Sequence, residues 1–250
     1  MSARHVAGAQ VDGVLFDIDD TLVATREAFG DALAVIARRY LPDVPPERDA
    51  ELVAVWREDV NGHYAAYTRG EVGFVAQRMA RANELHAAFG GPVLDDVAFA
   101  AWDEVFAAGF RDAWAAHEDA ADVVRELLGS GLVVGALSNA GTAFQTDKLE
   151  RAGLLGTVPM LVGVDTLGYG KPHADVFLEA CRRLGTEPAR TAYVGDELDV
   201  DAVAARDAGL VGIWLDRPDG RRHAISDATI AAADVTTITS LHELPALLGL

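Results

Sequence analysis

The feature that most constrains this chain is the stretch 14–22, where an apolar run ends in closely spaced carboxylates. Asp17 and Asp19 follow the run and are separated by one residue. Carboxylates crowded at the mouth of a buried strand repel each other unless a cation or a shared proton relieves them. An acidic loop without function is the alternative, but it leaves this crowding unexplained. The pattern favours one Asp as nucleophile and the other as proton donor or base, with a divalent cation beside them.

The composition is typical of a folded globular protein. The 250 residues are 50% hydrophobic, which suffices for one large domain or two modest ones. No segment approaches the roughly 18 apolar residues that cross a bilayer, so we expect neither a membrane span nor a secretory signal. The single Cys181 cannot form an internal disulfide, which fits a reducing, cytoplasmic setting. Its helical apolar surroundings predict a buried structural thiol rather than a nucleophile.

The charge of the chain excludes some classes of partner. A formal net charge of -18 repels nucleic acid and anionic membranes, and no basic cluster is larger than an Arg pair. A small phosphorylated substrate is compatible with this charge, because one metal ion and one cation can dominate a pocket. Lys148 and Lys171 are the only lysines, and every other cationic residue of the 21 is Arg.

The order of the predicted elements indicates an α/β fold. We expect strands at residues 11–16, 132–137, 160–164, 191–194, 211–215 and 234–238. We expect helices between them at residues 119–128, 142–152, 174–184 and 200–208, and a final helix from residue 240. Strands that alternate with helices predict a doubly wound parallel sheet covered on both faces.

A purely helical block interrupts this alternation. We expect helices at residues 25–40, capped by Thr25, and at residues 48–60, 71–89 and 94–110. No strand-like segment separates them. Residues 23–114 are therefore predicted to form an inserted helical cap domain, with residues 1–22 and 115–250 as the α/β catalytic core. Open α/β sheets bind ligands at the carboxyl ends of their strands, so a block inserted there indicates a lid.

Two later strand ends carry further polar groups. The apolar residues 133–137 lead into Ser138 and Asn139, which alone are also ordinary turn residues. Near residue 170, glycines and Pro172 hold Lys171 on a loop before a helix. A solvated loop lysine is the alternative. Because the chain uses Arg at nearly every other basic position, a lysine here favours a site that needs an ammonium. A compact point charge suits a position between oxyanions.

A fourth strand end carries a cluster of acids. Residues 193–195 lead into Asp196, and Glu197, Asp199 and Asp201 follow closely. Mg²⁺ prefers oxygen ligands and retains several waters, so one or two carboxylates suffice to bind it. Asp199 is alternatively a cap for the following helix.

Together the four stretches resemble those of the haloacid dehalogenase-like hydrolase superfamily, and within it the phosphatases with a helical cap after the first motif. The resemblance spans residues 11–215 and implies a Rossmann-like core. It implies that Asp17 attacks phosphorus to form an aspartyl-phosphate. It also implies that Asp19 protonates the leaving group and then activates water.

The same resemblance assigns the remaining site residues. Ser138 would hydrogen-bond the phosphoryl group with help from the Asn139 backbone N–H, and Lys171 would steady the phosphoryl oxygens and the nucleophile. Thr21, in the first motif, would bind the phosphate or substrate. The implied cofactor is Mg²⁺, with the ligands Asp17, Asp19, Asp196 and Asp201. Val200 and Glu197 stand where many relatives carry Asn and Ser, which leaves open whether Asp201 or Asp199 supports the metal.

The motifs also discriminate within the superfamily. Dehalogenases lack the second acid of the first motif because a leaving halide needs no proton, so Asp19 favours phosphoryl chemistry. Phosphonate hydrolases use a cap lysine, and residues 23–114 contain none. We therefore expect a Mg²⁺-dependent phosphatase acting on a small phosphorylated metabolite. A sugar-phosphate mutase and a non-catalytic binding protein on the same fold are the alternatives.

Substrate choice is expected to lie in the helical block. Its residues best able to contact an anion, a sugar or a base are His63, Tyr64, Tyr67, Arg69 and Arg78. An ordinary place on a helix surface or interface is the alternative for each of them.

Overall fold

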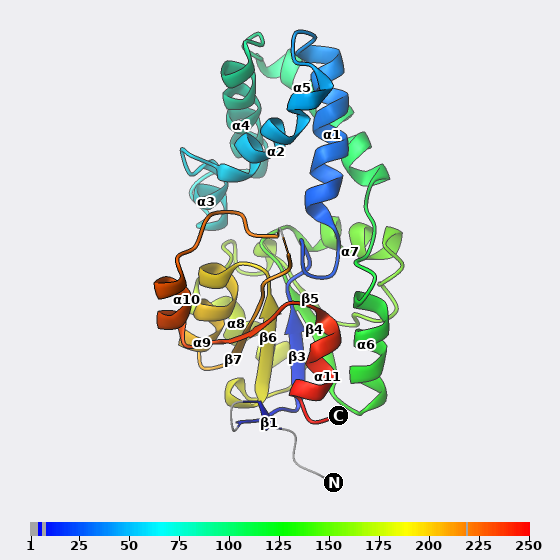
Figure 1. Ribbon diagram of the computed structural model, residues 1–250, viewed down its shortest axis with the longest axis vertical. Helices are drawn as coiled ribbons and strands as arrows, with labels where there is room; N and C mark the ends of the chain where they lie inside the picture. Colours follow the sequence, from blue (N-terminus) through cyan, green and yellow to red (C-terminus); the bar gives the residue numbers. More distant parts are fainter. Residues whose placement is uncertain (1–4, 7–8, 219) are drawn as a thin grey trace. The chain divides into compact units, whose positions relative to one another are not determined.

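The computed structural model describes residues 5–6, 9–218 and 220–250, and the chain forms two compact units (Figure 1). One unit combines the described chain up to Val23 with Ala116–Leu250, and the other is Ala24–Ala115. Residues 1–4, 7–8 and 219 of the predicted core lie outside the described residues. That the second unit acts as a cap domain for the first stays a prediction.

The first unit is built on a six-stranded sheet in which every neighbouring pair of strands is parallel. The strand order is β5-β4-β3-β6-β7-β8. The strands are β3 (Gly13–Phe16), β4 (Val133–Leu137), β5 (Leu161–Val162), β6 (Thr191–Gly195), β7 (Val211–Leu215) and β8 (Thr236–Ile238). A short antiparallel pair, β1 (His5–Val6) and β2 (Ala9–Gln10), precedes them. The predicted parallel α/β sheet is confirmed.

The topology of the sheet marks one edge for a ligand. β3 pairs with β4 on one side and with β6 on the other, and Phe16 lies in register with Ala136 and Val194. The chain continues outward from β3 to β4 and β5, but in the opposite direction from β6 to β7 and β8. The order therefore reverses between β3 and β6, and such a switch point opens a crevice at the carboxyl ends of the strands.

Helices follow the strands of this unit. They are α6 (Ala120–Gly129), α7 (Thr142–Arg151), α8 (Ala174–Leu184), α9 (Ala204–Asp207), α10 (Asp227–Ala233) and α11 (Leu244–Leu247). The helix predicted at 200–208 is only partly α-helical, because a π-helical turn, Leu198–Val203, precedes α9. Helix α10, whose first turn is capped by the Ser226 side chain, was not predicted from the sequence.

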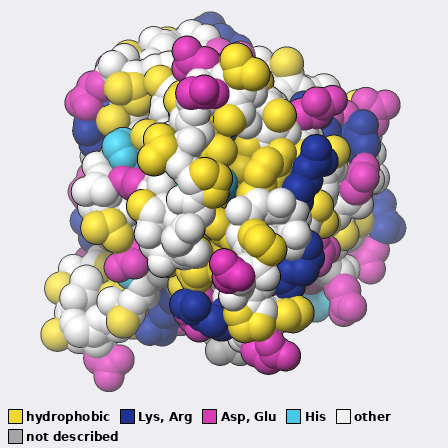
Figure 2. All heavy atoms as spheres, turned by 90° about the horizontal axis from the view of Figure 1, so that it is seen from above, with side chains coloured by type: hydrophobic (Ala, Val, Ile, Leu, Met, Phe, Trp, Pro, Cys, Tyr) yellow, Lys and Arg dark blue, Asp and Glu magenta, His cyan; other side chains and the backbone are white. Residues whose placement is uncertain are grey.

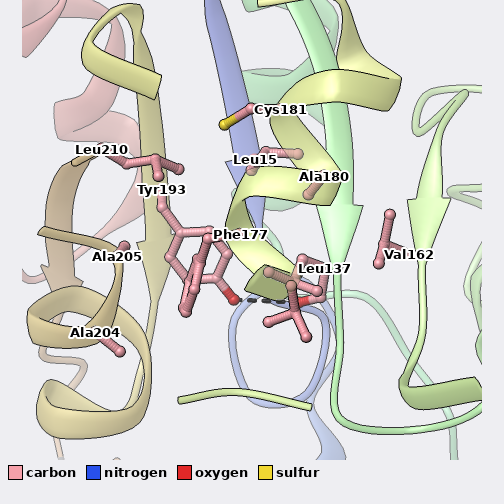
Figure 3. Close-up of a cluster of buried hydrophobic side chains, with 11 residues drawn as sticks. Leu15, Leu137, Val162, Phe177, Ala180, Cys181, Tyr193, Ala204, Ala205 and Leu210 are labelled. Atoms are coloured by element: carbon pink, nitrogen blue, oxygen red, sulfur yellow. Dashed lines mark hydrogen bonds between the residues drawn. The ribbon is translucent and has the colours of Figure 1, made fainter. Parts of the chain in front are cut away.

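An apolar cluster packs between the sheet and the helices α8 and α9 (Figure 3). Phe177 of α8 meets Tyr193 of β6 edge to face, with ring centroids 5.0 Å apart. The Tyr193 hydroxyl donates to the Leu137 carbonyl oxygen at 3.1 Å. Cys181 lies in this cluster with 1% of its surface exposed, so the predicted burial of this thiol is confirmed. Elsewhere in the unit, α6 contacts both β4 and α11.

The second unit is helical in its described secondary structure. Its helices are α1 (Thr25–Tyr40), α2 (Asp49–Glu58), α3 (His63–Thr68), α4 (Phe74–Phe89) and α5 (Asp96–Asp112), with a 3-10 turn at Pro46–Arg48. Trp102 and Phe106 of α5 stack at 5.2 Å in its aromatic core. The prediction that Thr25 caps α1 was wrong: Thr25 is the first helical residue and is buried, and Ala24 occupies the cap position without a side-chain hydrogen bond.

No helix in the described ranges combines the length and apolarity needed to span a membrane. Figure 2 shows one face of the molecule, on which basic side chains lie among acidic and hydrophobic ones. Charges of both signs are therefore mixed over this face.

Candidate active site

Asp17 stands at the carboxyl end of the central strand β3. Its backbone N–H donates to the Val194 carbonyl oxygen at 2.8 Å, which continues the pairing with β6, and its side chain is buried. The chain then reverses tightly, because the N–H groups of Leu22 and Val23 both donate to the Ile18 carbonyl oxygen. Asp20 takes a left-handed conformation in this turn, with φ of 59°.

Three acids from two strand ends converge. Single carboxylate oxygens of Asp17, Asp196 and Asp201 all lie within 4.8 Å of one another. Asp196 follows β6, and the Trp214 indole N–H donates to its carbonyl oxygen at 2.9 Å. A set of carboxylate oxygens suits a hard divalent cation such as Mg²⁺. This acidic group could therefore hold a metal ion.

Asp201, rather than Asp199, belongs to this acidic group. Asp201 is buried, and its Oδ2 accepts the Glu197 backbone N–H at 3.0 Å, whereas Asp199 is exposed. Gly195 makes this approach possible, because a Cβ there would overlap the Asp201 carboxylate. The role of Asp201 as a metal ligand stays a prediction.

Lys171 joins the acids from its own loop. Its Nζ lies 2.7 Å from Asp17 Oδ1, 2.6 Å from Asp201 Oδ1 and 2.8 Å from the Tyr193 hydroxyl. An ammonium has three N–H donors, so these three contacts give each donor of Lys171 a protein acceptor. Burial disfavours the charged ammonium, but the negative charges of Asp17 and Asp201 outweigh this effect and hold the pKa of Lys171 well above its usual value. A role for Tyr193 was not predicted from the sequence, in which its only signal was a phenol within a buried strand.

The carboxylates are crowded enough to oppose their own ionisation. Burial raises the pKa of Asp17 to about 8; Lys171 opposes this shift, and Asp201 and Asp19 add repulsion. Burial also raises the pKa of Asp196 well above its usual value, and the charges of Asp20 and Glu197 contribute. A divalent cation would relieve both desolvation and repulsion, so the donor set fits a metal ion electrostatically as well.

Asn139 fixes the loop that carries Lys171. Its Oδ1 accepts the Lys171 backbone N–H at 2.6 Å, and its Nδ2 donates to the Lys171 carbonyl oxygen at 3.0 Å. Gly170 lies so close to Asn139 Oδ1 that a Cβ would overlap it. The amide side chain therefore joins the segment after β4 to the loop that carries Lys171. The predicted help from the Asn139 backbone N–H stays a prediction.

The side chain of Asp19 has different neighbours from the acidic group. Its Oδ1 pairs with Lys148 Nζ, and its Oδ2 accepts from Gln145 Nε2 at 2.6 Å. Its carboxylate is not among the three that converge in the described chain, and its predicted part in binding metal stays a prediction. Lys148 and Gln145 were missed, although the scarcity of lysine was a signal for the first.

Ser138 and Thr21 are both buried, and in the sequence they lie close to Asn139 and Asp19 respectively. Ser138 Oγ accepts from Gln145 Nε2 at 2.7 Å, which links Ser138 to Asp19. Thr21 Oγ1 is buried without a hydrogen-bond partner among the described residues, and the Thr21 carbonyl oxygen accepts from Arg217 at 3.1 Å. The predicted contacts of Ser138 and Thr21 with a phosphoryl group stay predictions.

Most of the proposed substrate-selecting residues have partners within the helical unit. His63 lies 2.8 Å from Glu84, and Arg69 lies 2.6 Å from Glu71. Arg78 is buried, pairs with Asp103 at 2.6 Å and lies over the Phe106 ring. Tyr64 and Tyr67 contact each other. The surroundings of Arg78 are those of an interior packing residue, and the selecting roles stay predictions.

Residues 11–209 match the family model for haloacid dehalogenase-like hydrolases. The chain is 27% identical over 209 residues to a glyceraldehyde 3-phosphate phosphatase of Methanopyrus kandleri, a match that covers 83% of this chain and 84% of that protein. It is 28% identical over 224 residues to a ribulose-1,5-bisphosphate 5-phosphatase of Halopiger xanaduensis, covering 88% and 91%. The structure matches an L-2-haloacid dehalogenase from Xanthobacter autotrophicus with a TM-score of 0.74, covering 96% and 99%. At 19% identity, this last similarity is one of fold alone.

Proposed function

This chain belongs to the haloacid dehalogenase-like hydrolases, and from that premise we propose that it is a Mg²⁺-dependent phosphatase acting on a small phosphorylated metabolite. The observation that carries the proposal is the convergence of Asp17, Lys171, Asp196 and Asp201 at one sheet edge. The similarity to two phosphatases over most of their length supports a phosphate ester as the substrate.

Asp17 is the proposed nucleophile and Asp19 the proposed acid and base. A carboxylate oxygen of Asp17 forms a bond to phosphorus while the bond from phosphorus to the leaving oxygen breaks, and Asp19 gives that oxygen a proton. Asp19 then takes a proton from the water that attacks the aspartyl-phosphate. This step releases inorganic phosphate and restores the Asp17 carboxylate. Lys171 holds Asp17 Oδ1 and so fixes the orientation of the nucleophile.

Asp17, Asp196 and Asp201 would hold the Mg²⁺ ion. When bound, it supplies screening of the negative charge on the phosphate, without which an anionic nucleophile is repelled. Lys171 pairs with both Asp17 and Asp201 and so holds the two carboxylates close together, and Tyr193 contacts Lys171 and Asp201. Asp19 favours a phosphate ester over a halide substrate, because an alkoxide needs a proton when it leaves and a halide does not.

The test uses purified full-length protein and a panel of small phosphomonoesters, with released inorganic phosphate measured in Mg²⁺ and in excess chelator. We expect Mg²⁺-stimulated release from at least one compound. We expect Asp17→Asn to reduce turnover by about 10⁴-fold or more, because it removes the nucleophile. Asp122→Asn, which neutralises an exposed acid paired with Arg125, is the matched control and should retain activity.

Two results would overturn the proposal. One is full activity of Asp17→Asn, and the other is the absence of Mg²⁺-stimulated phosphate release across the panel. Transfer of the phosphoryl group to a second position of the product, without free phosphate, would instead identify a mutase.

A further inference from the structure

Helix α7 presents two donors to Asp19. Lys148 Nζ pairs with Asp19 Oδ1, and Gln145 Nε2 donates to Asp19 Oδ2 at 2.6 Å. Residues three apart on a helix share a face, so both side chains reach the carboxylate together. One donor on each oxygen fixes both the position of the carboxylate and its rotation.

The two partners of the Lys148–Asp19 ion pair differ in burial. The Lys148 side chain is 2% exposed, whereas the Asp19 side chain is 33% exposed. Burying an ammonium has a large desolvation cost, which an ordinary structural ion pair offsets best when both partners are enclosed. Here the cation lies beneath and the carboxylate stays accessible. This arrangement supports a carboxylate held ready for a reactant.

Gln145 links this carboxylate to a second site residue. Its amide nitrogen donates to Asp19 Oδ2 and to Ser138 Oγ, at 2.6 and 2.7 Å, and so uses both of its donors. Its Oε1 is buried without a hydrogen-bond partner among the described residues. An unpaired buried acceptor is unfavourable, so the orientation of the amide is governed by its two donor contacts.

The two lysines of the chain contact different carboxylates. All three donors of Lys171 have acceptors among Asp17, Asp201 and Tyr193, and none of these contacts is to Asp19. We propose that Lys148 and Gln145 are positioning residues that hold Asp19 for its acid and base steps, as Lys171 holds Asp17. This inference rests on the proposed function.

A double-mutant cycle tests the inference in the full-length protein with Mg²⁺, on the phosphomonoester that the panel identifies. We expect Lys148→Met to lower kcat by about 10- to 100-fold with KM changed less than about threefold, because misplacing a catalytic group affects turnover rather than binding. The variant Lys148→Met/Asp19→Asn should be no slower than Asp19→Asn alone, because both changes remove one interaction. Gln145→Leu should be similarly non-additive with Asp19→Asn.

Two further variants separate positioning from folding. Lys148→Arg keeps a cation on α7 and should recover part of the lost kcat. Arg151→Met removes an exposed cation, paired with Asp147, from the same helix and should leave kcat unchanged. Thermal unfolding of each variant checks that it is folded at the assay temperature. If Lys148→Met is not folded at that temperature, the double-mutant cycle of Gln145→Leu with Asp19→Asn tests the inference in its place.

The outcomes distinguish this inference from the proposed function. An active wild-type protein in which Lys148→Met slows Asp19→Asn by a further tenfold or more would overturn the inference alone, because Lys148 would then act without Asp19. Unchanged kcat in folded Lys148→Met would do the same. A wild-type protein without phosphatase activity would overturn the proposed function and this inference with it.

Discussion

Among single residues, the one on which the site depends most is Lys171, a buried ammonium with one acceptor for each of its three N–H donors. Lys171 is 3% exposed, and its donors meet two carboxylates and one phenol. Removing one partner of a buried ion pair leaves a charge without compensation, which is strongly unfavourable. The choice of Tyr at position 193 follows from this requirement, because Phe would fill the same space without an acceptor.

Asp201 and Asp199 give the sharpest comparison at this scale. We expect Asp201→Asn to weaken Mg²⁺-dependent activity by about 10- to 100-fold, because Asp201 supports the acidic group and accepts from Lys171. Asp199→Asn removes the same charge from an exposed position and should stay within about twofold of wild type. Activity titrated with Mg²⁺ measures both. Equal losses in the two variants would contradict the placement of Asp201 in the metal site.

Among the secondary-structure elements and loops, two glycines allow neighbouring segments to approach each other closely. Gly195, at the end of β6, leaves room for the Asp201 carboxylate of the π-helical turn. Gly170 leaves room for the Asn139 side chain, which binds the Lys171 backbone. Each glycine is needed for a close approach between segments, which no other residue permits without displacement.

The approach at Gly170 leads to a prediction. Gly170→Ala should push the Asn139 side chain away and break its two hydrogen bonds to Lys171, because the added Cβ overlaps Asn139 Oδ1. We expect a loss of about 1–3 kcal/mol in the free energy of unfolding and a decrease in kcat of about tenfold. Denaturant titration and steady-state kinetics measure these effects.

Gly141→Ala is the control for this prediction. A Cβ at Gly141 would meet its nearest atom, Asp165 Oδ2, at an ordinary 3.8 Å. This variant should remain close to wild type in stability and kcat. If Gly170→Ala behaved like the control, the hydrogen bonds of Asn139 would not be what holds the Lys171 loop.

At the scale of the whole molecule, Asp119 ties three distant segments of the α/β unit together. Its carboxylate accepts from Arg217, which follows β7, and from Ser240 and the Leu241 backbone near the end of the chain. Burial opposes ionisation, but Arg217 and the other donors hold the pKa of Asp119 at about 2. Arg217 also donates to the Thr21 carbonyl oxygen, so this network supports the first motif.

The lowered pKa of Asp119 predicts a pH dependence of stability. Since an unfolded Asp has a pKa near 3.9, ionised Asp119 stabilises the fold above about pH 4, and this contribution is lost as the pH falls towards 2. The loss should be on the order of 2 kcal/mol. Urea titrations of wild type and Asp119→Asn between pH 6 and 2 measure it as the difference between the two curves. A constant difference across this range would contradict the assignment.

The division into two units predicts the result of an excision. Val23 and Ala116 pair in an antiparallel bridge, and the His117 N–H donates to the Leu22 carbonyl oxygen at 3.0 Å. The two chain ends that removal of residues 24–115 would leave in the α/β unit are therefore adjacent. Replacing residues 24–115 by a short Gly/Ser linker should leave a unit that unfolds cooperatively. It should hydrolyse an aryl phosphate slowly and discriminate at least tenfold less between metabolites, if the helical unit is the cap. Unchanged discrimination would contradict that role.

The parallel α/β sheet and the polar groups that follow three of its strands, β3, β4 and β6, could be predicted from the sequence alone. Both follow from local hydrophobic patterns and from the rule that parallel strands end at one edge. Short elements escaped this reasoning: α10 was missed, and the apparent cap Thr25 proved to be a buried helical residue, because its neighbours rather than its type decide its place.

Which polar groups meet could be read only from the folded chain. Asp19 and its partners Gln145 and Lys148 are 126 and 129 residues apart in the chain, and Lys171 and Asp17 are 154 apart. Such contacts depend on the rotation of α7 and on the packing that brings Tyr193 beneath Lys171. The choice of Asp201 over Asp199 likewise depends on the turn that follows β6. A hydrophobic pattern fixes which face of an element is buried, but pairing between distant side chains is fixed by how those faces pack together.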